Sequence, residues 1–289
     1  MRSGITTDIL REPRMQGTAP EVEAVSAGYS FRPARVVNNA PLSVIIPAYN
    51  EERTILQALE GVLAIPCVGQ VIVVNDGSSD GTAVRLSTVR DSRVAVLHHA
   101  TRAGKGAAIR SGLGRVSGEL VVIQDADMEY SASELPALAA VILSGEAVVV
   151  YGSRFRGGIT GMAFANRVAN RLLTLLTNCL YGSHLSDEAT CYKMFRSEVL
   201  QSLPLQCVGF EFCPEVTALV LRRGLAIAEV PISYRGRCNA AGKKIRWWHF
   251  VTAVRTLVRY RFASVGDRSI ARPALAPNAA GRPRPWEET

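Results

Sequence analysis

Three carboxylates follow a short apolar run in the stretch VVIQDADMEY, residues 121–130. Asp125, Asp127 and Glu129 occupy alternate positions, and alternate side chains of an extended chain point to the same side. Like charges held together repel each other unless a cation lies between them, and hard divalent cations take carboxylate oxygens. The spacing therefore predicts a Mg²⁺ or Mn²⁺ site completed by substrate phosphates. The alternative is a solvated turn with surface acids, which a DxD triplet alone does not exclude.

Other polar residues also stand where apolar segments end. Tyr49 and Glu51 follow the run LSVIIPA, and Asp76 follows VIVVN. Asp76 could accept hydrogen bonds from a base or a ribose, or it could simply cap a loop. The glycine-bearing stretch GKGAAIRSG, residues 104–112, matches neither the GxGxxG nor the GxxxxGK[ST] pattern. A dinucleotide-binding site or a P-loop is therefore disfavoured.

These residues need a scaffold that brings them together, and the hydrophobic pattern predicts one. Strands are predicted at 42–50, 71–75, 93–99, 119–124 and 147–153, with helices at 50–64, after the turn 76–82, at 104–118 and at 131–145. Apolar strands that alternate with helices indicate a mostly parallel, doubly wound α/β sheet with helices on both faces. Ligands of such sheets bind beyond the carboxyl ends of the strands, where these polar residues fall.

Composition agrees with a globular protein. Hydrophobic residues make up 48% of the 289 residues, which is enough for a sizeable core. The apolar runs are far shorter than the roughly 18 residues of a membrane span, and we see no secretory signal, so a cytoplasmic protein is expected. The six cysteines form no CxxC pair, and we expect reduced buried thiols rather than a zinc site or a disulfide framework.

The positive charge is concentrated near the carboxyl end of the chain. Eight Lys and Arg residues and no acids lie between Val230 and Gly266, and they equal the net charge of +8. This pattern predicts an anionic partner. Residues 245–262 have helical spacing, with Trp247, Phe250, Val251, Val254, Leu257 and Val258 expected on one face. Such a helix lies in a membrane interface, packs on the core, or meets a membrane helix of another chain.

The two ends of the chain differ from its middle. Residues 1–40 lack periodicity, and residues 267–289 are rich in Pro, Ala and Arg, so both are expected to be disordered. This leaves one folded domain at 41–235 and a basic amphipathic segment at 236–266.

Several motifs occur together in one order. PAYNEE (47–52), VIVVNDGSSDGT (71–82), GKGAAIRSG, QDADMEY (124–130) and YGSRF (151–155) follow one another at ordinary spacings. The sequence resembles the family 2 inverting glycosyltransferases, which have the GT-A fold. DEATCYKMF, GFEF, EVPISYRGR and GKKI, between residues 187 and 245, resemble its polyprenyl-phosphate branch, typified by dolichol-phosphate mannose synthase.

The resemblance implies metal-dependent transfer of a sugar from a sugar nucleotide to a polyprenyl phosphate, by a peripheral enzyme at the cytoplasmic face of a membrane. Mannose from GDP-mannose is the first expectation, and a UDP-sugar is the second. The implied residues for binding the nucleotide sugar are Pro47, Tyr49, Glu51, Asp76, Asp125, Ala126 and Asp127. The implied metal ligands are Asp125, Asp127 and Glu129. The implied catalytic residues are Asp127, Arg154 and Arg237, and the two arginines would contact phosphate.

The resemblance leaves some points open. Asn75 stands where the family commonly has Asp, which changes nucleotide preference only if that residue contacts the base. A phosphate acceptor needs no strong general base, and we find no convincing His–carboxylate dyad. For a hydroxyl acceptor on a polysaccharide or small molecule, Asp187, Glu211 and Glu215 are the candidate bases, although each also fits a solvated or helix-surface acid. A nucleic-acid-binding module is a distant alternative, because the acidic cluster would repel a phosphate backbone.

Overall fold

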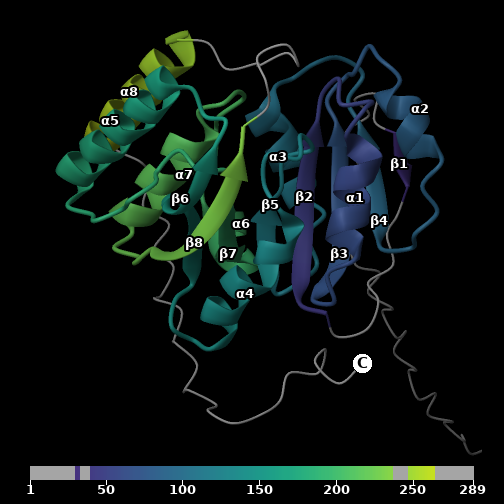
Figure 1. The fold of residues 1–289 in the computed structure, drawn as a ribbon, viewed down its shortest axis with the longest axis horizontal. Helices are drawn as coiled ribbons and strands as arrows, with labels where there is room; N and C mark the ends of the chain where they lie inside the picture. The colour runs from purple at the N-terminus through teal and green to yellow at the C-terminus, as the bar shows by residue number, and fades with distance from the viewer. Residues whose placement is uncertain (1–29, 33–39, 237–246, 264–289) are drawn as a thin grey trace, which may run out of the picture.

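The computed structural model describes residues 30–32, 40–236 and 247–263 (Figure 1). Within these residues, one mixed sheet of eight strands has the order β1-β4-β3-β2-β5-β7-β6-β8. The strands are β1 Ser30–Arg32, β2 Leu42–Ala48, β3 Val68–Asn75, β4 Val94–His98, β5 Leu120–Ile123, β6 Val149–Thr160, β7 Lys193–Arg196 and β8 Ala228–Arg235. The helices are α1 Ile55–Leu63, α2 Thr82–Ser87, α3 Lys105–Leu113, η1 Ala132–Glu134, α4 Leu135–Leu143, α5 Phe164–Tyr181, α6 Ser197–Ser202, α7 Phe212–Arg222 and α8 Trp247–Phe262.

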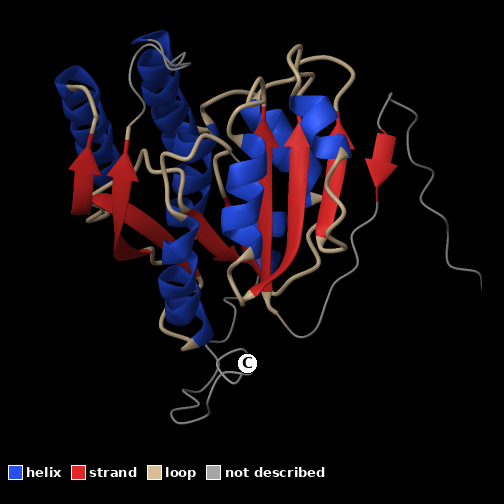
Figure 2. Cartoon of the chain, turned by 45° about the vertical axis from the view of Figure 1, so that its right-hand side comes forward, coloured by secondary structure: helices blue, strands red, loops and turns tan. Residues whose placement is uncertain are grey.

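The sheet is mostly parallel, as the sequence predicted. Strand β2 pairs in parallel with β3 and β5, β3 with β4, and β6 with β8. Strand β7 runs antiparallel between β5 and β6, and β1 runs antiparallel along β4. Most arrowheads therefore point to the same edge of the sheet (Figure 2). The loops that follow β2, β3 and β5 meet at this edge.

Helices cover both faces of the sheet, because neighbouring residues of its central strands are buried on opposite sides. Ile46 of β2 packs in one cluster with Leu59 of α1, whereas Ile45 packs in the other with Ile109 of α3. Both isoleucines are fully buried. This two-sided burial explains why the strands read as continuous apolar runs rather than alternating ones.

Some elements differ from the prediction. The helix predicted at 50–64 begins only at Ile55, as α1, although Asn50 is a residue type that often caps helices. Asn50 has φ +52°, and its side chain accepts a hydrogen bond from the Ser79 backbone N–H at 2.8 Å. Strand β8 was not predicted, and it contains Pro231, which is tolerated because β8 lies at the edge of the sheet.

The structure describes only part of the two ends of the chain. Residues 30–32 form β1, so the prediction that 1–40 is a wholly disordered arm is wrong for this segment. The tail at 267–289 and much of the basic segment, including Arg237, lie outside the described residues.

Helix α8 packs on the core and also exposes apolar side chains. Ala253, Leu257 and Tyr260 are buried, and the Tyr181 hydroxyl of α5 donates to the Leu257 carbonyl at 2.7 Å. The exposed apolar side chains of α8 are Trp248, Val251, Val258 and Phe262. Val251 and Val258, expected to share the face of Leu257, therefore lie elsewhere. Among the described helices, none combines the length and apolar character that crossing a bilayer requires.

The docking of α8 gives a paired stability test on adjacent residues. Leu257→Ala should lower the free energy of unfolding by about 2–5 kcal/mol, because the side chain is fully buried and leaves a cavity. Val258→Ala, at a 40% exposed position, should change it by less than about 0.5 kcal/mol. Urea unfolding of both variants measures the difference, and equal effects would show that α8 is not packed in this way.

Candidate active site

One pocket of about 580 Å³ lies at the carboxyl ends of the parallel strands. It collects every described residue that the family resemblance assigns to nucleotide-sugar binding, metal binding or catalysis, but not the candidate bases Asp187, Glu211 and Glu215. These lining residues are Pro47, Tyr49 and Glu51 after β2, Asp76 after β3, Asp125, Ala126, Asp127 and Glu129 after β5, and Arg154 of β6. The residues come together because parallel strands deliver their following loops to the same edge.

The acidic loop after β5 is held by neighbouring side chains. Lys105 Nζ donates to Asp125 Oδ1 at 2.6 Å, and Asp127 Oδ1 accepts from the Glu129 backbone N–H at 3.1 Å. Glu129 Oε2 accepts from the Tyr234 hydroxyl at 2.6 Å. Burial, followed by this hydrogen bond, raises the pKa of Tyr234 above its ordinary value, so the hydroxyl stays a donor.

This arrangement bears on the predicted metal site. Among the described residues, no group of three His, Cys, Asp or Glu side chains is placed to hold a metal ion. Asp125 and Asp127 supply carboxylate oxygens on one short loop, which suits a cation that takes one or two carboxylates and completes its coordination with phosphates. Glu129, the third predicted ligand, is instead engaged by Tyr234. The residues therefore fit a divalent cation bound together with its substrate.

Lys105 is a site residue that the sequence analysis missed. It is the first residue of α3, and its side chain is 16% exposed. Burial tends to lower the pKa of its ammonium group, but opposite charges, first of all Asp125, raise it above its ordinary value. A charged lysine beside the acidic loop can bind a phosphate oxygen. The sequence signal that could have identified Lys105 is its place in GKGAAIRSG, a stretch that was compared only with glycine-rich nucleotide-binding patterns.

Asp76 sets the position of Lys105. Its two carboxylate oxygens accept from the backbone N–H groups of Ala103 and Gly104, each at 2.8 Å, and Oδ1 is 2.7 Å from His99 Nδ1. Gly104 has φ +104°, and a Cβ there would lie 2.2 Å from the Val208 carbonyl oxygen. Asp76 thus fixes the turn that leads into α3. Its predicted contact with a base or ribose stays a prediction.

Asn75 orients the loop that follows β3. Its Nδ2 lies 3.0 Å from His98 Nδ1, and its Oδ1 accepts from the Ser78 backbone N–H at 3.2 Å. The side chain is buried and does not line the pocket. The geometry therefore favours the interpretation that residue 75 orients the loop rather than contacting the base, and the amide of Asn75 is sufficient for this role.

Arg154 is locked in a buried ion pair with Asp187. Its Nε and Nη2 each donate to the Asp187 carboxylate at 2.7 Å, and its backbone N–H donates to the same group at 3.0 Å. Asp187 is fully buried, and Arg154 also lies over the Tyr234 ring at 5.4 Å. Arg154 lines the pocket, so this clamp presents a fixed positive charge to a ligand.

The three acids considered as bases are all engaged in holding the fold. Asp187 neutralises Arg154. Glu215, which is 1% exposed, accepts from the backbone N–H groups of Gln206 and Cys207 and from the Tyr260 hydroxyl. Glu211 accepts from the backbone N–H groups at 208 and 209. The expectation of solvated surface acids is wrong for Asp187 and Glu215.

The cysteines agree in part with expectation. The five described cysteines are free thiols, of which Cys67 and Cys207 are buried, whereas Cys179 is exposed. Cys191 and Cys213 line the pocket, and Lys105 Nζ lies 3.3 Å from Cys191 Sγ.

Comparison with known proteins identifies the family. Residues 43–203 match the family model "Glycosyl transferase family 2", so the chain belongs to this family. It is 30% identical over 235 residues to the low-salt glycan biosynthesis hexosyltransferase Agl6 of Haloferax volcanii, with 78% of this chain and 56% of the relative covered. It is 31% identical over 217 residues to the polyprenol monophosphomannose synthase of Mycolicibacterium smegmatis, with 71% and 81% covered. The chain thus spans just over half the length of the first relative.

The fold has solved counterparts. Glucosyl-3-phosphoglycerate synthase from Mycobacterium tuberculosis, in complex with Mn²⁺ and UDP-glucose, superposes with a TM-score of 0.60 at 26% identity. The match covers 76% of this chain and 78% of that one. The predicted GT-A fold is confirmed, and the relatives named for polyprenol and undecaprenyl phosphates confirm the resemblance to the polyprenyl-phosphate branch of the family.

The buried pair gives a test that separates a clamp from a general base. Asp187→Asn should lower the free energy of unfolding by about 3–5 kcal/mol, because Arg154 would keep a buried charge without its counter-ion. Glu119→Gln, which breaks the exposed pair with Arg196, should lower it by less than about 1 kcal/mol. Denaturant unfolding measures both changes. An Asp187→Asn protein with the stability of the unsubstituted chain would rule out the clamp.

Proposed function

We propose that this chain transfers a sugar from a sugar nucleotide to the phosphate of a polyprenyl phosphate at a membrane surface. One observation carries the proposal: the pocket joins a charged end to an apolar end. The charged end holds Asp125, Asp127, Lys105 and Arg154. The apolar end lies between α5, α7 and α8 and is lined by Ala165, Ala169, Leu173, Phe212, Phe250 and Ala253.

The charged end suits two phosphate-bearing substrates. Mg²⁺ or Mn²⁺ held by Asp125 and Asp127 would stabilise the negative charge of the departing nucleoside diphosphate. Lys105 and Arg154 add fixed positive charge, which favours binding of phosphate oxygens. An acceptor phosphate is already ionised and needs no proton removed. This agrees with Asp187, one of the candidate bases, which is paired with Arg154 and does not line the pocket.

The relatives support this choice of substrates without fixing it. One relative is named for polyprenol monophosphomannose, and the solved neighbour binds Mn²⁺ and UDP-glucose. We therefore propose mannose from GDP-mannose as the first donor to test and UDP-glucose as the second. The predicted phosphate contact of Arg237 belongs to the same proposal.

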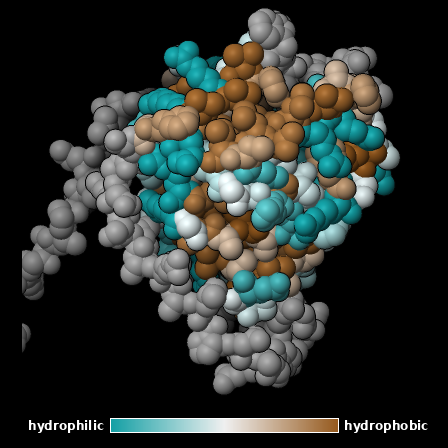
Figure 3. All heavy atoms as spheres, turned by 90° about the vertical axis from the view of Figure 1, so that its left-hand side faces the viewer, coloured by the Kyte–Doolittle hydropathy of each residue, from teal (hydrophilic) through white to brown (hydrophobic). Residues whose placement is uncertain are grey.

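We propose that an exposed apolar surface beside the apolar end of the pocket faces the membrane. Exposed apolar side chains line α5 and α8, and they gather on one face of the molecule (Figure 3). They are Phe164, Val168, Leu172 and Leu175 of α5, and Trp248, Val251, Val258 and Phe262 of α8. Neither helix contains an acid, and Arg167, Arg171, Arg255, Arg259 and Arg261 are exposed on them. Such a surface suits the interface of an anionic membrane. Its predicted cytoplasmic side stays a prediction.

Substitution in the acidic loop tests the reaction. Asp127→Ala should reduce product formation at least about 100-fold, because charge on the departing diphosphate loses its stabilisation. The assay supplies Mn²⁺ and GDP-mannose or UDP-glucose, with and without a polyprenyl phosphate, and identifies products by mass. Asp91→Asn, at a surface pair with Arg93, is the matched control and should retain activity. Near-normal turnover of Asp127→Ala refutes the role of the loop, and a sugar found only on a hydroxyl acceptor refutes the lipid-phosphate proposal.

The membrane proposal has its own variant. A fourfold variant replaces Phe164, Leu172, Val258 and Phe262 by Ser. Its affinity for vesicles containing anionic lipid should fall at least about tenfold, because less apolar area is buried in the membrane interface. Val84→Ser, at a 70% exposed position on α2, should leave binding unchanged. Vesicle co-sedimentation measures both. Undiminished sedimentation of the fourfold variant would show that this surface does not contact the membrane.

A further inference from the structure

The pocket wall continues beyond the acidic loop along two thiols. Lys105 Nζ, which holds Asp125, lies 3.3 Å from Cys191 Sγ. The thiol of Cys213 in α7 donates to the Thr190 carbonyl oxygen at 3.5 Å. Glu188 comes next, near Cys213, and all of these side chains except that of Thr190 line the same cavity. A ligand with phosphates at Asp125 and Lys105 would reach Glu188 by following this wall.

Glu188 is a buried acid whose carboxylate oxygens have no hydrogen-bonding partner among the described residues. Its side chain is fully buried, and neither carboxylate oxygen makes a hydrogen bond within the described part of the chain. Two polar side chains near it, those of Thr217 and Lys193, donate hydrogen bonds to backbone carbonyl groups. Thr217 donates its hydroxyl hydrogen to the Cys213 carbonyl at 2.8 Å, and Lys193 Nζ donates to the backbone carbonyl of Glu188 at 2.7 Å. Burial raises the pKa of Glu188 to about 7, although Lys193 opposes this.

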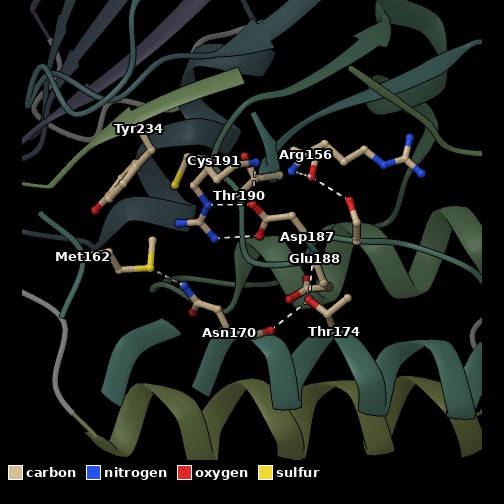
Figure 4. Close-up of polar contacts among 12 residues, drawn as sticks. Arg156, Met162, Asn170, Thr174, Asp187, Glu188, Thr190, Cys191 and Tyr234 are labelled. Carbon is tan, nitrogen blue, oxygen red and sulfur yellow. Dashed lines mark hydrogen bonds and ion pairs between the residues drawn. The ribbon is translucent and has the colours of Figure 1, made fainter. Parts of the chain in front are cut away.

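The backbone around Glu188 is fixed, so the carboxyl group is held in place. The Glu188 backbone N–H donates to Thr174 Oγ1 of α5 at 3.0 Å, and Thr174 donates to the Asn170 carbonyl at 2.9 Å. Figure 4 shows Glu188 between Asp187 and Thr174. Burying a carboxyl group without a hydrogen bond is unfavourable for folding. The Glu188 carboxyl group, buried in the cavity wall, is therefore suited to accept a hydrogen bond from a donor group on a bound ligand.

The chemistry of that partner follows from the position of Glu188. In a sugar nucleotide the group attached to the diphosphate is a hexose, whose hydroxyl groups are hydrogen-bond donors. We propose that Glu188 accepts a hydrogen bond from a hydroxyl of the donor sugar and thereby helps to select the sugar. This inference rests on the proposed function. A site built to hydrogen-bond a hydroxyl also discriminates against analogues that lack it, because its own polar group is then left unpaired.

A partly buried acid outside the cavity provides a control. Glu134 Oε2 is buried and makes no hydrogen bond with any residue that the structure describes, and Glu134 does not line this cavity. Its other carboxylate oxygen accepts from the Ser233 backbone N–H at 2.7 Å. Glu134→Gln therefore makes the same chemical change away from the pocket.

The experiment compares binding of sugar nucleotides with binding of the bare nucleotides. Calorimetry with Mn²⁺ would measure GDP-mannose against GDP, and UDP-glucose against UDP, for the full chain and for Glu188→Gln, Glu188→Met and Glu134→Gln. Glu188→Met should weaken the preferred sugar nucleotide about ten- to a hundredfold, the range for a hydrogen bond to a charged group, and leave the bare nucleotide unchanged. Glu188→Gln should show a smaller loss, and Glu134→Gln none. Among deoxy-sugar analogues, the one lacking the contacted hydroxyl should bind the unsubstituted chain as weakly as the hexose binds Glu188→Met.

Thermal unfolding separates this role from a structural one. Glu188→Met should keep or raise Tm, by about 2–4 °C, because an unpaired buried carboxyl is removed. Three results would overturn the assignment of Glu188: an equal loss of affinity for the sugar nucleotide and the bare nucleotide, unchanged affinity for both, or a large fall in Tm. If the unsubstituted chain binds GDP and UDP but neither sugar nucleotide, the proposed donor fails and this inference with it, whereas a defect confined to Glu188 variants leaves the proposed function intact.

Discussion

Compensation of buried charge is the constraint on which the candidate site depends. The carboxyl edge of the sheet gathers acids from several loops, and their repulsion would open the structure if each stood alone. Asp125 is neutralised by Lys105, and Asp187 by Arg154. These pairs contribute little net stability, because desolvation offsets most of the attraction. Their main effect is geometric, since each pair fixes a positive charge at the wall of the pocket.

The charge at Lys105 is placed through backbone contacts rather than through packing alone. Asp76 binds the N–H groups of Ala103 and Gly104, and this turn aims the first residue of α3 at the acidic loop. Asp76 thereby links the loop after β3 to the turn after β4, although its sequence motif alone suggests a residue that binds the ligand. The same residue can do both only if a ligand reaches the carboxylate from the pocket side, and Asp76 does line the pocket.

The sequence predicted strands β2 to β6, because burial on both faces leaves continuous apolar runs such as that of β2, but it did not predict the parallel edge strand β8. It also predicted which strand-end residues line the pocket, since strand ends follow from those runs. It did not predict β7, whose four residues include the fully buried Lys193 and look like no apolar strand. Nor could it tell that Asp187 and Glu215 point inward, because an acid becomes a structural residue only through partners distant in sequence, such as Arg154 and Tyr260.

Under the proposed function, the two ends of the pocket impose opposite demands on the chain, and helix α8 reconciles them. A diphosphate needs a polar wall built on rigid strands, whereas a lipid needs apolar side chains that reach the bilayer. Helix α8 meets the second demand without weakening the first. Leu257 packs on the core and Tyr260 bonds to Glu215, while Val251 and Phe262 stay exposed. Because the helix is anchored by one face, its other face stays exposed, as the proposed contact with lipid requires, while the pocket beneath keeps its shape.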